Sequence, residues 1–278
     1  MKKLIIPVFI VLLYILMNSY IKNINLNGNT NFINKLLKIS NYHFNNNELK
    51  KENLIDPVFL IEKVFAYEDI KPVLNENTQE FNYMKNNKKV YIYSTHPNES
   101  YIDSNTLYGM DFDIVEASKL LKDELEKLGI DVVVEDKRAD NYIKENNLKF
   151  KDSYLVTREF IKERLSDNYD LIIDLHRDEA SKKTTTAIID DKNYAKVMFV
   201  NNVNYENKNI SNKINNIILK NYPNLSRGIY KKYISNFNQD LANNIILIEL
   251  GGNKNTLDEV LNTIPILALS IGEYLYER

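Results

Sequence analysis

The sequence predicts an α/β domain whose central sheet is mainly parallel and flanked by helices, preceded by an N-terminal transmembrane helix. Strand-like and helix-like periods alternate from residue 88 onward, which is typical of this fold class. An uncharged apolar run opens the chain, and 44% of the 278 residues are hydrophobic, enough for one sizeable core. We therefore expect three segments: an anchor at residues 1–21, a stalk at 22–87 and a folded domain at 88–278.

The first segment has the pattern of a signal anchor. Lys2 and Lys3 precede an apolar run from Leu4 to about Tyr20. The run is slightly shorter than the roughly 20 residues that span a bilayer, but tilt and snorkelling lysines make up the difference. No small-x-small cleavage site follows, which favours an uncleaved anchor over a removed signal peptide. A buried core helix is disfavoured because the run stands at the extreme N-terminus and Asn-rich sequence follows it. The two lysines place the N-terminus in the cytoplasm, so we expect a single-pass cell-membrane protein whose folded domain is extracytoplasmic.

The second segment has the composition of an extracytoplasmic stalk. It is rich in Asn and Lys and contains one apolar island, residues 53–68, which is suited to a short docking helix. His43 lies in this stalk with no acidic residue at ligand spacing. We interpret it as an incidental polar position.

Local patterns place the elements of the folded domain in order. Asp113 and Glu116 have the spacing of a capping box before the first helix, which Gly129 ends. Thr256 and Glu259 have the same spacing before the last helix. The predicted strands are 88–94, 130–136, 169–175, 184–190, 196–202 and 245–250, and the predicted helices are 111–129, 153–167, 205–222 and 255–277.

Charge and cysteine content exclude several classes of function. The formal net charge is −2 and no basic block occurs, so a nucleic acid is not an expected partner. The chain has no cysteine, which removes disulfides, thiolate nucleophiles and Cys-type zinc sites. Histidine, aspartate and glutamate are therefore the remaining metal ligands.

Three apolar strands end abruptly in polar residues. The strand at 88–94 leads to His96, the one at 169–175 leads to His176, and the one at 245–250 reaches Glu249. Ligands of open α/β sheets lie outside the carboxyl ends of the strands, so we expect these three side chains to converge. Either Asp174 or Asp178 is placed to orient His176 through its second ring nitrogen.

Glu99 completes a candidate metal set. It lies three residues after His96 on the turn that leaves the strand, and a tight turn lets both side chains bind one ion. Two histidines and one carboxylate are the protein ligands of many catalytic zinc sites, which keep a fourth position for water. Glu249 then remains as the general base. A lone H-x-x-E pair is more often a polar surface turn, and the metal interpretation depends on His176 also ending a buried strand.

Three blocks carry a resemblance to a known family. THPNESY at residues 95–101, DLHRDE at 174–179 and IELGGNKNTLDEVLNT at 248–263 resemble the signature blocks of the stage II sporulation protein P family, roughly from residue 88 to the C-terminus. The resemblance implies a zinc-dependent N-acetylmuramoyl-L-alanine amidase, related in fold to bacterial cell-wall amidases. It also implies an endopeptidase activity, a role in engulfment during sporulation, and the stage II sporulation proteins D and M as partners.

The resemblance also implies roles for individual residues. His96, Glu99 and His176 correspond to metal ligands and Glu249 to the catalytic residue. Cell-wall amidases take their carboxylate ligand from a later helix start, so other acids compete with Glu99 for this role: Asp111, Asp113 and Glu116.

The function expected from these observations is cleavage of the amide between N-acetylmuramic acid and L-alanine in septal peptidoglycan by a membrane-anchored zinc amidase. Arg177 either meets a carboxylate or carbonyl of the substrate or forms a structural ion pair. Two alternatives remain open: a zinc carboxypeptidase or endopeptidase acting on stem peptides, and a non-catalytic scaffold that binds murein.

Overall fold

The computed structural model describes residues 88–102 and 112–277, which belong to one compact unit. The predicted anchor at 1–21 and stalk at 22–87, including His43, lie outside the described residues. No helix in the described ranges is long and apolar enough to cross a membrane.

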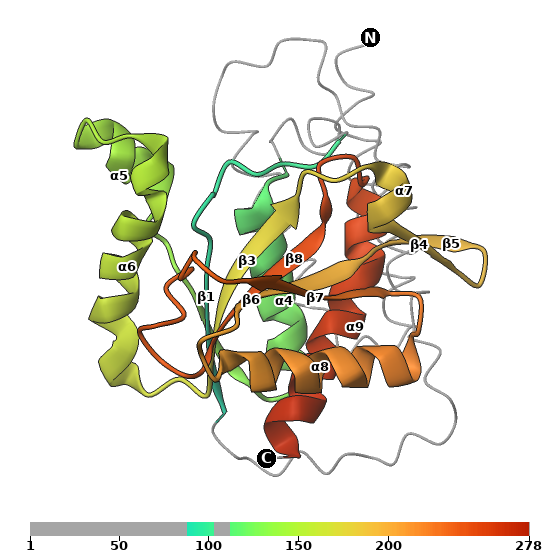
Figure 1. The fold of residues 1–278 in the computed structure, drawn as a ribbon. Helices are drawn as coiled ribbons and strands as arrows, with labels where there is room; N and C mark the ends of the chain where they lie inside the picture. The colour runs from blue at the N-terminus through green and yellow to red at the C-terminus, as the bar shows by residue number, and fades with distance from the viewer. Residues whose placement is uncertain (1–87, 103–111, 278) are drawn as a thin grey trace, which may run out of the picture. The chain divides into compact units, whose positions relative to one another are not determined.

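A six-stranded sheet forms the centre of the domain, in the order β2-β1-β3-β8-β6-β7 (Figure 1). Every neighbouring pair is parallel except β8 and β6, which are antiparallel. The mainly parallel sheet predicted from the sequence is confirmed. Its strands are β1 (Lys89–Tyr93), β2 (Asp131–Val134), β3 (Leu171–Asp178), β6 (Val197–Asn202), β7 (Ser226–Lys232) and β8 (Ile245–Gly252).

The predicted strand at 184–190 belongs to a separate antiparallel hairpin, made by β4 (Thr186–Ile189) and β5 (Lys192–Ala195). Asp190 and Asp191 form its turn with φ values of 47° and 60°, the left-handed conformations that two-residue hairpin turns favour. Strand β7 was not predicted, because its sequence SRGIYKK has little apolar character. It is an edge strand, and its pairing with β6 is a tertiary contact that local pattern does not report.

The four predicted helices are present, with α5 and α7 as short additions. Asp113 caps α4 by accepting hydrogen bonds from the backbone N–H groups of Val115 and Glu116. Thr256 and Glu259 form the predicted capping box of α9. The helices are α4 (Ile114–Lys127), α5 (Ala139–Glu145), α6 (Ser153–Arg164), α7 (Lys182–Thr185), α8 (Asn207–Asn221) and α9 (Leu257–Tyr276).

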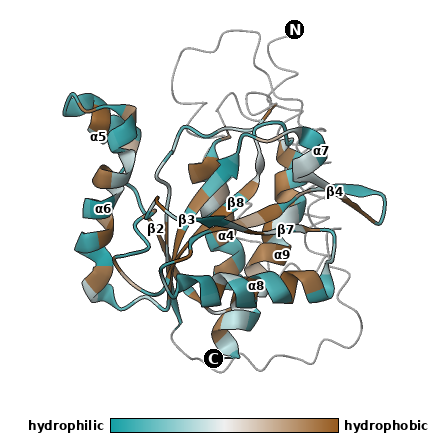
Figure 2. Ribbon diagram, viewed as in Figure 1, coloured by the Kyte–Doolittle hydropathy of each residue, from teal (hydrophilic) through white to brown (hydrophobic). Residues whose placement is uncertain are grey.

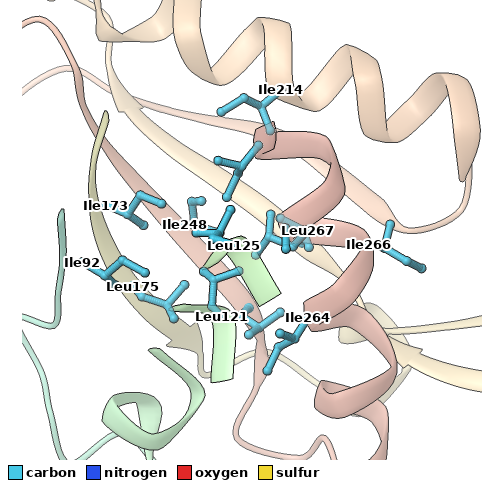
Figure 3. Close-up of a cluster of buried hydrophobic side chains, with 14 of the residues drawn as sticks. Ile92, Leu121, Leu125, Ile173, Leu175, Ile214, Ile248, Ile264, Ile266 and Leu267 are labelled. Atoms are coloured by element: carbon cyan, nitrogen blue, oxygen red, sulfur yellow. The ribbon is translucent and has the colours of Figure 1, made fainter. Parts of the chain in front are cut away.

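Helices cover both faces of the sheet. The buried faces of α4, α8 and α9 share one apolar cluster with the strands, in which Leu121, Ile214 and Leu267 meet Ile173 and Ile248 (Figure 3). On the opposite face, α6 packs against a smaller cluster of strand residues, and α5 packs in turn on α6. The apolar residues of the strands concentrate in the middle of the domain (Figure 2). Because β1, β3 and β8 are parallel neighbours, their carboxyl ends lie side by side at one edge of the sheet. This edge is next to the face that α6 covers.

Truncating one core residue tests how much of the stability lies in the larger cluster. Leu267 is fully buried in α9, so Leu267→Ala is expected to lower the free energy of unfolding by about 3 kcal/mol, through lost burial and the cavity left behind. Leu269→Ala, the same change at a partly exposed position of the same helix, is the control. Urea denaturation measures both, and equal losses would contradict this assignment of the core.

Candidate metal centre

The turn after β1 brings His96 and Glu99 together. The backbone N–H of Glu99 donates to the carbonyl of His96 at 3.0 Å, closing a tight turn. Within it, Nδ1 of His96 lies 3.3 Å from Oε1 of Glu99. The H-x-x-E stretch is thus a polar turn that points both of its ionisable side chains the same way.

His176 reaches the same place from β3. Its Nδ1 lies 3.4 Å from Oε2 of Glu99, and its ring centroid is 5.1 Å from that of His96. The donor atoms of His96, Glu99 and His176 all lie within 4.8 Å of one another, and they form the one group of three or more such side chains within residues 88–102 and 112–277. The structure brings together the three residues that the sequence proposed as ligands.

This donor set fits a divalent metal ion. Zinc–ligand bonds are about 2.0–2.2 Å, so two ligands of a tetrahedral ion are about 3.4 Å apart. The separations of the two Nδ1 atoms from the Glu99 oxygens are 3.3 and 3.4 Å. Burial alone would raise the pKa of Glu99, but hydrogen bonding to His176 and His96 lowers this pKa to about 2. A carboxylate that stays ionised, flanked by two imidazole nitrogens, is suited to zinc.

Asp174 holds the far side of His176. Nε2 of His176 lies 2.9 Å from Oδ1 of Asp174, although not along the direction of a straight hydrogen bond. Asp174 is fully buried and accepts hydrogen bonds from the backbone N–H of Thr95 at 3.0 Å and from its hydroxyl at 2.7 Å. Asp178, the alternative, instead accepts a hydrogen bond from Arg227 at 2.7 Å. Asp174 is therefore the carboxylate that positions His176.

The electrostatic surroundings of His176 follow from these contacts. Burial alone would lower the pKa of its imidazole, but Asp174 and Glu99 raise this pKa well above its ordinary value. The imidazole is thus held between two carboxylates, one on each ring nitrogen. The two carboxylates therefore favour a positive charge on this ring, which either a proton or a metal ion at Nδ1 can supply.

Glu249 lies directly opposite His176 in the register of β3 and β8. Its Oε2 is buried and has no hydrogen-bond partner among the described residues. Burial, helped by the charges of Glu99 and Asp178, outweighs the pull of His176 and raises the pKa of Glu249 to about 7. A carboxyl group that titrates near neutral pH beside a metal site is suited to general base and acid chemistry.

Gly251 shapes the strand end just after Glu249. Its φ is +68°, and a Cβ here would lie 2.8 Å from Oδ1 of Asn255 and 2.9 Å from Cβ of Ala195. Only glycine adopts this backbone conformation without strain at such close approach. The glycine thus lets the end of β8 pass close to Ala195 and Asn255, two residues after Glu249.

The competing carboxylates are engaged elsewhere or lie outside the described residues. Asp113 caps α4 and pairs with Arg138 at 2.9 Å. Glu116 pairs with Lys119 on the surface of α4 and does not complete the capping box. Asp111 is outside the described ranges. Within those ranges, Glu99 is the carboxylate that joins the two histidines.

Arg177 supports Glu99 in a way that the sequence did not indicate. Its backbone N–H donates to Oε2 of Glu99 at 2.9 Å, and its side-chain Nε donates to the carbonyl of Ser100 at 3.0 Å. Arg177 thus ties β3 to the turn that carries His96 and Glu99. Its guanidinium is directed by a backbone carbonyl, not by an acidic side chain.

Two aromatic side chains beside the histidines were also missed. Phe150 stacks on His96 with ring centroids 4.8 Å apart. Tyr154 of α6 lies edge-on to His96 at 5.6 Å and parallel to His176 at 6.4 Å. Nothing in the local sequence links these residues to the strand ends, because the link is the packing of α6 on the sheet.

The fold is similar to that of solved cell-wall amidases. It is similar to the solved CwlD amidase from Clostridioides difficile in complex with the GerS lipoprotein, with a TM-score of 0.50 at 16% identity, covering 69% of this chain and all of that chain. An N-acetylmuramoyl-L-alanine amidase from Clostridium difficile 630 matches with a TM-score of 0.44 at 17% identity, over 69% of this chain and 96% of that one.

Sequence comparison identifies the family. Residues 16–272 match the profile of the stage II sporulation protein P (SpoIIP) family, so the chain belongs to this family. The stage II sporulation protein P of Bacillus subtilis (strain 168) is 33% identical over 190 residues, which span 62% of this chain and 47% of that protein. The chain thus aligns with about half the length of this relative.

Replacing each of the two candidate orienting carboxylates separately by asparagine tests the site. Asp174→Asn is expected to weaken zinc binding by the full chain about 10- to 100-fold, because Asn withdraws the negative charge behind His176. Asp178→Asn is the matched control and should leave zinc affinity unchanged, since Asp178 bonds to Arg227. Zinc titration against a competing chelator measures both, with thermal unfolding as the check on folding. A larger loss in Asp178→Asn would contradict the assignment.

Proposed function

We propose that this chain is a zinc-dependent N-acetylmuramoyl-L-alanine amidase that acts on septal peptidoglycan during sporulation. The carrying observation is the cluster of His96, Glu99 and His176 at the carboxyl edge of the sheet, with Glu249 opposite His176. Membership of the stage II sporulation protein P family supports a role in sporulation, and the amidase fold supports hydrolysis of the cell wall.

The proposed roles follow from the surroundings of each side chain. His96, Glu99 and His176 would hold the zinc ion, which would supply a Lewis acid that acidifies water and polarises the scissile carbonyl. Asp174 keeps His176 oriented through its second nitrogen. Glu249 takes the proton of the attacking water and delivers it to the nitrogen of the departing L-alanine, because its raised pKa allows both transfers near neutral pH.

The same proposal includes the setting of the enzyme. An uncleaved anchor at residues 1–21 would hold the domain on the outer face of the cell membrane, with residues 22–87 as a spacer. The expected partners, stage II sporulation proteins D and M, rest on the family alone.

Digestion of purified peptidoglycan by the full chain tests the reaction. Zinc-loaded protein is expected to release stem peptides with a free N-terminal L-alanine, and a chelator should abolish the release. Mass spectrometry of the fragments separates the alternatives. Loss of the terminal residue of the stem would favour a carboxypeptidase, cleavage within the stem an endopeptidase, and no cut bond in the presence of zinc a scaffold.

Two glutamate variants separate metal binding from catalysis. Glu249→Gln is expected to keep zinc and to lose activity roughly 100-fold or more, because the amide cannot accept the proton of water. Glu99→Gln should lose zinc and activity together. Zinc content of the purified variants and release of L-alanine ends are the two measurements. Loss of zinc in Glu249→Gln, or its full retention in Glu99→Gln, would show the assigned roles to be wrong.

A further inference from the structure

A pocket of about 460 Å³ lies next to the metal centre. Tyr154, Leu155 and Arg158 of α6 line one side, and residues between 234 and 240 line the other. Tyr154 also contacts the rings of His96 and His176, so pocket and metal centre share a wall. The volume is within the range of sites that enclose a small ligand or one unit of a larger one.

The lining of this pocket combines aromatic and aliphatic side chains with polar ones. The apolar residues are Tyr154, Leu155, Ile234 and Phe237. The ring of Phe237 meets the ring of Tyr154 edge-on, with centroids 5.6 Å apart. Leu155 and Ile234 stand at the rim with 64% and 91% of their surface exposed. Large exposed apolar side chains around a pocket are typical of a binding site. Aromatic side chains pack well against the C–H face of a pyranose ring.

The pocket has no net charge. Arg158 and Asp240 are the charged residues among its lining. They neutralise each other through two hydrogen bonds, of 2.9 and 2.7 Å, from the guanidinium to the two carboxylate oxygens. A ligand carboxylate would find no uncompensated cation among these lining residues, whereas the hydroxyl and acetamido groups of a sugar can bond to a neutral polar surface.

The wall opposite α6 is held in a strained conformation. Phe237 and Asn238 have φ values of 50° and 55°, a region that non-glycine residues seldom occupy and that clusters at functional sites. The side-chain amide of Asn238 donates to the carbonyl of Tyr154 at 3.1 Å and to the hydroxyl of Thr157 at 3.2 Å. Gln239 bonds to the backbone of β6 at two points. These buried amides fix Phe237 against Tyr154 before any ligand arrives.

We propose that this pocket binds an N-acetylated sugar ring of the glycan strand and so positions the sugar side of the scissile amide at the metal centre. The proposal rests on the proposed function, because the amide cleaved there joins two parts of peptidoglycan, the glycan strand and the stem peptide. The stem peptide carries carboxylates, while the glycan strand presents neutral acetamido sugars. The pocket has no net charge and is partly aromatic, so it fits the glycan strand.

Ligand-observed saturation-transfer NMR on the full chain tests the proposal. The chain carries Glu249→Gln as its background substitution, so that no turnover occurs. The probes are the trisaccharide of N-acetylglucosamine and, separately, a free stem tripeptide. The trisaccharide is expected to bind, and its ring protons should receive saturation. Stem-peptide binding that is lost on altering the pocket would overturn the proposal in favour of a peptide site.

Phe237→Ala is expected to weaken trisaccharide binding about tenfold, the loss of one aromatic wall. Leu155→Ala should weaken it by a smaller factor, and this exposed position keeps the test valid if Phe237→Ala fails to fold. Ile188→Ala, an exposed residue of the β4–β5 hairpin outside the pocket lining, is the control and should bind as the background does.

The outcomes separate the two proposals. No trisaccharide binding, or binding undiminished in both pocket variants, would overturn the sugar site even if peptidoglycan is cleaved as an amidase cleaves it. Sugar binding that depends on Phe237 and Leu155, in a chain that cleaves no bond, would leave the sugar site standing and remove the proposed reaction.

Discussion

Asp174 is a carboxylate with no exposed surface, and burying such a charge costs several kcal/mol unless donors surround it. Thr95 supplies two donors from the end of β1, and His176 lies against the other side. Satisfying Asp174 therefore fixes the end of β1 beside β3. The turn with His96 and Glu99 begins at the next residue, so the constraint that orients His176 also places its two partners.

The same buried network reaches beyond the metal centre. The hydroxyl of Thr95 lies 3.1 Å from that of Thr157 on α6, which in turn accepts a hydrogen bond from Asn238. A continuous polar chain thus joins Asp174 to the segment that carries Phe237. Since a partly satisfied buried network is costly, α6 and this segment are held in place by the same requirement as the strand ends. The position of the neighbouring pocket is not independent of the site.

How much of this could be predicted depends on the range of the interaction. The strand ends at His96, His176 and Glu249 were visible, because apolar runs stop there and parallel strands align their carboxyl ends. Asp174 and Asp178 stand two residues to either side of His176, so spacing could not separate them. A register shift in the β3–β8 pairing just after His176 separates them. Strand β7 and the stacking of Tyr154 arise from tertiary packing and have no local signal.

Glu99 and Glu249 show how one fold gives two carboxylates different work. Both are largely buried beside His176, yet two imidazoles and a backbone N–H surround Glu99, while one oxygen of Glu249 has no donor. The pKa of Glu99 falls to about 2 and that of Glu249 rises to about 7. A permanently charged carboxylate suits an ion, and one that exchanges a proton near neutral pH suits a base. The difference between the two pKa values has two causes. The turn directs Glu99 between the histidines, and the strand keeps Glu249 apart from hydrogen-bond donors.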